Sequence, residues 1–233
     1  MKPLFLYILF FSFAGFAQQQ PTKVTYAKSV DSFVTKGWKI ITTAKGDLNK
    51  DGTEDVALVI EDTDKANIIT NTEANALPEN FNTNPRHLLL LFKDKLANTY
   101  YLQAKNESFI PPKDNPNMPC LVDPLLDSGE LAIKNGTLQI TLQNFTSCGN
   151  WADDTYTYTL RYQQGEFKLI GFDSNGSNRA TGEVFNISIN YLTKKKSSTN
   201  GENRFEDDKS KHKIVWETIK VNKLLTLTDL NRT

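Results

Sequence analysis

Ten consecutive residues, 46–55, place oxygen-bearing groups at alternating positions of a short polar loop. Positions 1, 3, 5, 7 and 9 of this loop are the candidate ligands of a hard cation: Asp47, Asn49, Asp51, Thr53 through its backbone carbonyl, and Asp55. Gly52 falls at position 6, where a calcium loop turns so sharply that glycine is the residue best suited to the backbone. The spacing predicts one metal site.

A simple hairpin turn is the alternative reading, because Asp and Asn side chains also stabilise turns by bonding to nearby backbone amides. Without a cation, however, Asp47, Asp51 and Asp55 would crowd together and repel one another. Calcium is favoured over magnesium, which keeps several waters and takes few protein ligands. We expect Ca²⁺ with a structural role, since binding to a folded site adds to the free energy of folding.

The residues after the loop indicate which kind of calcium site this is. An EF-hand requires a bidentate Glu at position 12 and a following helix, but position 12 is Leu58, inside the apolar run 55–60. The pattern Asp-x-Asn-x-Asp-Gly-x-x-Asp instead resembles the strand-loop-strand calcium site of integrin-type FG-GAP repeats. A propeller would repeat this motif at a fixed period, and the sequence has no second copy, so a full propeller is not predicted.

Alternating apolar residues and turn signals predict a mainly β fold, or α+β with one short helix over 27–34. We expect antiparallel sheets built from hairpins, within a single domain over 18–233. Long polar loops are expected at 62–86 and 197–211, and an irregular segment at 110–119, which holds four prolines. The strands are expected at 39–44, 55–60, 88–92, 100–103, 131–134, 137–142, 155–162, 184–191 and 212–219.

Two hairpins can be given a register. The Asn135-Gly136 dipeptide is a strong two-residue turn signal, and it would pair Ile133 with Leu138 and Leu131 with Ile140. A turn at Gln164-Gly165 would pair Tyr162 with Phe167 and Leu160 with Leu169. In both cases the apolar residues then share one face, as a half-buried pair requires.

The first 17 residues have the features of a cleaved signal peptide: Lys2, a short apolar run from Leu4 to Phe16, and a small-x-small site at Gly15-Phe16-Ala17. The run is short for a bilayer span, so no membrane span is expected in the mature chain. We therefore expect a secreted or periplasmic protein. In that compartment Cys120 and Cys148 are expected to form a disulfide, worth roughly 3–4 kcal/mol in the chain-entropy model.

Composition excludes some function classes. The 27 acidic and 27 basic residues cancel, so the basic excess expected of a nucleic-acid-binding domain is missing. The two histidines, His87 and His212, lack partners at zinc spacing, and no nucleophile elbow or P-loop motif is present.

Three other places remain as candidates. Trp151, Asp153 and Asp154 could form the acidic and aromatic site of a secreted hydrolase, or they could be solvated turn residues. The stripe of Tyr156, Tyr158 and Tyr162 could bind carbohydrate, although a core face explains its period better. The 62–86 loop could bind a glycan or a protein partner. Arg86 could bind an anion, but an ion pair at a strand end is the commoner role.

The order of motifs along the mature chain also resembles a set of uncharacterised exported bacterial β-rich proteins with a single FG-GAP-like loop. The resemblance rests on segments 46–52, 55–60, 84–92, 156–162, 165–171 and 189–193. At 146–151 the relatives tend to have a glycine-rich segment that this chain lacks. The resemblance implies an exported β-rich protein and no particular activity. We expect a monomeric, calcium-binding domain that is more a binding or envelope protein than an enzyme.

Overall fold

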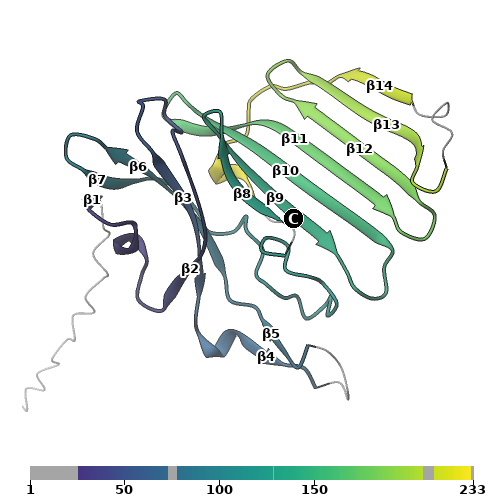
Figure 1. Ribbon diagram of the computed structural model, residues 1–233, viewed down its shortest axis with the longest axis horizontal. Helices are drawn as coiled ribbons and strands as arrows, with labels where there is room; N and C mark the ends of the chain where they lie inside the picture. The colour runs from purple at the N-terminus through teal and green to yellow at the C-terminus, as the bar shows by residue number, and fades with distance from the viewer. Residues whose placement is uncertain (1–25, 73–77, 128, 207–212, 232–233) are drawn as a thin grey trace, which may run out of the picture.

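The computed structural model describes residues 26–72, 78–127, 129–206 and 213–231 (Figure 1). It confirms a mainly β fold, with no α-helix and three short 3-10 helices in the described residues. The predicted signal peptide 1–17 and His212 lie outside them. The strands are β1 (Tyr26–Ala27), β2 (Trp38–Gly46), β3 (Asp55–Asp62), β4 (Ile68–Thr70), β5 (Asn80–Asn82), β6 (Arg86–Asp94), β7 (Thr99–Asn106), β8 (Glu130–Lys134), β9 (Thr137–Phe145), β10 (Ala152–Gln163), β11 (Glu166–Asn178), β12 (Glu183–Asn190), β13 (Lys195–Asn203) and β14 (Lys213–Thr218).

Two antiparallel sheets form the body of the described chain. A five-stranded sheet has the order β1-β7-β6-β3-β2, and a seven-stranded sheet has the order β14-β13-β12-β11-β10-β9-β8. Their edge strands β2 and β8 lie beside each other, while β12, β13 and β14 extend away from the five-stranded sheet (Figure 1). Neither sheet closes on itself, so the fold is no propeller.

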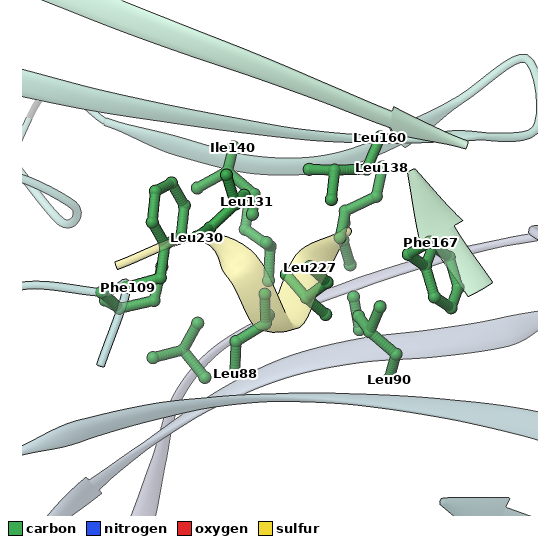
Figure 2. Packing of buried hydrophobic residues seen from close by; sticks show 14 of the residues in the cluster. Leu88, Leu90, Phe109, Leu131, Leu138, Ile140, Leu160, Phe167, Leu227 and Leu230 are labelled. Carbon is green, nitrogen blue, oxygen red and sulfur yellow. The ribbon is translucent and has the colours of Figure 1, made fainter. Parts of the chain in front are cut away.

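The main core lies between the two sheets. Leu88 and Leu90 from β6 face Leu138, Ile140 and Leu160 from β9 and β10, and all five are fully buried. A short 3-10 helix near the C-terminus, Leu227–Asp229, enters this layer and adds Leu227 and Leu230 (Figure 2). The Asn106 side-chain amide donates to the carbonyls of both residues, which anchors the chain end between the sheets.

Strand β3 is buried on both faces, as its continuous apolar run predicted. Ala57 and Val59 belong to the main core, whereas Val56, Leu58 and Ile60 face a second cluster on the outer side of the five-stranded sheet. That second cluster is closed by Phe33 and, partly, by Val30 and Val34. Because successive side chains of a strand alternate, an all-apolar strand can serve two cores at once.

Both predicted hairpin registers are confirmed. Ile133 pairs with Leu138 and Leu131 with Ile140 across the Asn135-Gly136 turn, whose two residues both have positive φ. Tyr162 pairs with Phe167 and Leu160 with Leu169 across the second turn. The disulfide between Cys120 and Cys148 is also present.

Two local predictions were wrong. The segment 27–34 is not an α-helix, because Tyr26–Ala27 pairs with β7 and only Val30–Phe33 turns, as a 3-10 helix capped by Ser29. The segment 197–211 is not a single loop, because residues up to Asn203 belong to β13 and hydrogen-bond to β12 and β14. Backbone pairing on two sides can hold a strand that lacks an apolar face. Residues 207–212 of that segment lie outside the described residues.

The predicted 62–86 loop contains a small hairpin of β4 and β5, with residues 73–77 between them not described. The proline-bearing 110–119 segment is irregular, as expected. It is linked to the rest of the fold through Asp114, whose backbone amide donates to the Asn82 carbonyl and whose carboxylate accepts from the Asn82 amide.

Candidate metal loop

The candidate loop connects β2 to β3, and the last rung of this hairpin pairs Gly46 with Asp55. Two residues within it have positive φ: Lys50 at 64° and Gly52 at 81°. The second value is the left-handed conformation for which position 6 predicted glycine. The sequence therefore identified the backbone shape of the loop correctly.

Three of the candidate ligands lie close together. The Asp51 backbone amide donates to Asp47 Oδ1 at 3.1 Å and to Asn49 Oδ1 at 3.0 Å, so these two oxygens flank one nitrogen. The other Asp47 oxygen accepts from the Gly52 amide at 2.9 Å. Asp51 accepts from the Asn49 side chain and from the Thr53 amide. Loop positions 1, 3 and 5 thus converge over one turn of the backbone.

Asp55 is placed differently, because it is completely buried at the base of the loop. Its Oδ2 accepts from the amides of Leu48 and Asn49, and its Oδ1 accepts from the amide of Lys93 on β6. A carboxylate has about four lone-pair positions, so these three bonds leave about one on Oδ1. Asp55 fastens the loop to the sheet and retains little capacity for a cation.

The two acids titrate in opposite directions. Burial raises the pKa of Asp55, and the negative charge of Asp51 adds to this, although the three backbone amides work against it. For Asp51, burial is outweighed by hydrogen bonds from Asn49 and Thr53, and its pKa is lowered. Asp51 is therefore suited to remain ionised, whereas no positive side chain of the described residues acts on the Asp55 carboxylate.

The loop is also joined to the other sheet. Leu48, at loop position 2, is only 1% exposed and belongs to the main core. A side chain added at Gly46 would meet Ile133 of β8, and Gly136 in the β8–β9 turn lies against the Lys50 side chain. An ion held by this loop would thus stiffen the corner where the two sheets meet.

The fit of the loop to a hard cation is partial. Within the described residues, no group of three or more His, Cys, Asp or Glu side chains gathers closely enough to hold a metal. The oxygen ligands that the loop brings together are a mixed set, namely the carboxylates of Asp47 and Asp51 and the side-chain amide of Asn49. Calcium accepts such mixed oxygen ligands, together with waters. The structure brings Asp47, Asn49 and Asp51 together, and leaves Asp55 to support them.

The predicted hydrolase residues are not brought together as a pair. Asp153 and Asp154 are consecutive in β10, so their side chains point to opposite faces of the sheet. Asp153 accepts a hydrogen bond from Gln143, while Asp154 lies over Gly176 on the other face. Trp151 is 61% exposed, and the guanidinium of Arg179 sits against its ring. Two carboxylates that flank one bond, as a glycosidase needs, are not found in this loop.

The tyrosine stripe is mainly a core face, as its period suggested. Tyr158 and Tyr162 pack against the main core, with edge contacts to Phe109 and Phe92. Tyr156 does not belong to that cluster.

Arg86 makes an ion pair, the commoner of its two predicted roles. It is only 1% exposed, donates to Glu61 through Nε, and binds both oxygens of Asp123 at 2.7–2.8 Å. The partners were not anticipated, since Glu61 ends an apolar strand and Asp123 lies in an irregular segment. A cation two residues before a run of four leucines was the available signal that buried anions would be needed.

No helix among the described residues has the length and apolar content needed to cross a membrane. Comparison of the chain with protein-family models, with curated proteins and with solved structures found no match.

Proposed function

We propose that the chain is an exported, calcium-binding β-domain with a binding or envelope role and no catalytic activity. The observation that supports this best is the convergence of Asp47, Asn49 and Asp51 around the Asp51 amide, beside the buried Asp55. Water and the Thr53 carbonyl would complete the coordination. The Cys120–Cys148 disulfide is consistent with an oxidising compartment.

The ion has a structural role in this proposal. The loop lies where β2 meets the β8–β9 turn, so calcium would hold the two sheets in register at their shared corner. It would also offset the mutual repulsion of the clustered carboxylates, which otherwise opposes folding.

Thermal unfolding with calcium and with a chelator tests the proposal. Calcium at 100 times its dissociation constant stabilises a folded protein by about 2.7 kcal/mol. In a chain of this size that corresponds to a rise of on the order of 5–10 °C in the unfolding midpoint. Asp51→Ala should abolish the rise.

Asp64→Ala is a matched control for loss of a turn-capping carboxylate. Asp64 accepts from the amide of Ala66, just past the end of β3 that lies opposite the candidate loop. This variant should lose some stability and keep the full response to calcium. An unchanged midpoint of the unmodified protein on adding calcium would refute the metal site.

A further inference from the structure

One face of the seven-stranded sheet changes from core to surface along its width. Near β8 this face is buried, since Ile140 and Leu160 are fully buried in the main core. Farther along, on β12, Phe185 of the same face is 54% exposed, and Ile187 and Ile189 are partly exposed. Figure 1 shows these outer strands extending beyond the opposite sheet. Between the buried part and the exposed part of this face lies a strip of partly exposed residues.

Strand register defines the strip. One row across the sheet pairs Asn144 with Asp154, Asp154 with Gly176, and Gly176 with Phe185. Directly paired residues of antiparallel strands project from the same face. The next row along the strands follows the same rule and contains Leu142, Tyr156, Ser174 and Ile187. We call these eight residues, with Phe172 beside them, the sheet-face strip.

The aromatic part of the strip is ordered by contacts. The rings of Tyr156 and Phe172 lie nearly parallel, at 14° with centroids 6.3 Å apart. Phe172 also packs on Tyr158, which is fixed in turn by the buried Phe109. Both rings of the parallel pair remain partly exposed. The core therefore holds the ring pair from one side and leaves it accessible from the other.

The polar part of the strip sits directly beside these rings. Asp154 leans over Gly176, where any side chain would collide with its carboxylate. Burial raises the pKa of Asp154, the charge of Asp153 raises it further, and a hydrogen bond with Tyr156 lowers it. Among the residues that the structure describes, Asp154 has no ion-pair partner. A partly buried carboxylate without a cation gains most from hydroxyl or amide donors supplied by a ligand.

We propose that the sheet-face strip binds a neutral β-linked glucose chain. The axial C–H groups of each β-glucose ring make an apolar face that can contact Tyr156 and Phe172. Its equatorial hydroxyls radiate at the ring edge, where Asp154, Asn144 and Ser174 can accept from or donate to them. The strip spans four strands, β9 to β12, at about 4.8 Å spacing, which suits an extended chain.

Other ligand classes match these residues less well. A nucleic acid or an anionic lipid surface needs cations, and the only charged member of the strip is Asp154. The core of a protein interface is depleted of aspartate and serine, and an added peptide strand binds at a sheet edge, not on a face. The combination of paired rings with a carboxylate, an amide and a hydroxyl is the chemistry of sugar recognition.

Titration calorimetry with cellohexaose on the full mature chain tests the proposal, with maltohexaose, an α-linked hexamer, as the comparison sugar. Cellohexaose should bind and maltohexaose should bind at least tenfold more weakly. Asp154→Ala and Tyr156→Ala should each weaken cellohexaose binding at least tenfold. Asp173→Asn is the matched control, because Asp173 pairs with Thr157 on the opposite face of the same strands; its affinity should stay within twofold.

Three outcomes would overturn the assignment: no heat with cellohexaose, equal binding of both sugars, or an affinity that neither strip variant changes. Unfolding midpoints of all variants identify any that fail to fold, and Tyr156→Phe then serves as a milder probe that keeps the ring and removes the hydroxyl. The metal proposal is tested separately, because Asp51→Ala should leave cellohexaose binding within twofold.

Discussion

The two ends of β3 each bury a carboxylate, and they neutralise it in different ways. At the start of the strand, Asp55 is satisfied by backbone amides and forms no ion pair with any residue that the structure describes. At the end, Glu61 is held by Arg86 at 2.8 Å and by Lys39 at 2.9 Å. Burial acts on both groups, yet it raises the pKa of Asp55, while the cations lower that of Glu61.

This difference shows why one end of β3 is a candidate metal loop and the other is not. The Glu61 end carries its own cations, because two carboxylates, Glu61 and Asp123, face two positive side chains. The Asp55 end gathers Asp47 and Asp51 nearby, and no ion pair among the described residues holds any of these three carboxylates, although the charge of Lys95 acts on Asp51 from farther away. An ion from solution would there do what Arg86 does at the far end of the same strand.

The largest effect is expected from removing the buried cation. Arg86→Met would leave Glu61 and Asp123 buried without their shared partner, which costs about 3–5 kcal/mol. At 2–4 °C per kcal/mol the unfolding midpoint should fall by on the order of 6–20 °C. Chemical denaturation measures the change in free energy directly.

A triple variant, Arg86→Met with Glu61→Gln and Asp123→Asn, separates the buried charges from the lost packing. Removing all three charges should recover part of the stability that Arg86→Met loses, since no uncompensated ion remains. If the triple variant is less stable than the single one, the buried charges are not the source of the loss.

The dependence of stability on pH should also differ between the two ends. The lowered pKa of Glu61 and Asp123 means that their contribution is present above their unfolded values, 4.5 and 3.8, and is lost as pH falls through the folded values. The raised pKa of Asp55 acts in the opposite direction. Without calcium, stability should decline as pH rises from 3.8 through the folded value of Asp55.

Calcium bound by Asp47 and Asp51 should weaken the second effect, because a nearby positive ion favours the ionised form of Asp55 and lowers its pKa. Unfolding free energies measured from pH 3 to 7, in chelator and in calcium, check this. Each unit of pKa difference is worth about 1.4 kcal/mol. Asp55→Asn should remove the decline seen in chelator. If the unfolding free energy of this variant still declines as pH rises, another titrating group causes the decline.

Features that depend on neighbouring residues could be predicted from the sequence, and features that depend on distant residues could not. The turn at Gly52, the double burial of β3 and the Asn135-Gly136 register depend on neighbours in the sequence, and all were predictable. The partners of Arg86 come from 25 and 37 residues away, so no local pattern revealed them. Likewise β13 has no apolar period and is defined by the strands on either side.

The candidate sites divide in the same way. Spacing alone grouped Asp47, Asn49 and Asp51, since one turn of backbone holds them. Spacing could not show that the Asp55 oxygens accept hydrogen bonds from backbone amides, one of which is that of Lys93 on another strand. Proximity in sequence also suggested a pair at Asp153 and Asp154, and strand geometry separates them.

The smallest predicted effect concerns the more exposed cation at the Glu61 end. The Lys39 side chain is 55% exposed, although the Glu61 carboxylate that it contacts is only 3% exposed. Solvent screening therefore limits its contribution, and Lys39→Met should cost about 0.5–1 kcal/mol. Lys45→Met is the matched control, because the pair of Lys45 with Glu54 is exposed on both sides at 3.5 Å. This variant should change stability less.

At 1 M salt the screening length is about 3 Å, so the effect of Lys39→Met should shrink while that of Arg86→Met persists. If the effects of Lys39→Met and Arg86→Met were equally sensitive to salt, solvent ions would reach Arg86. The contrast between Arg86 at one end of β3 and a calcium ion at the other would then no longer hold.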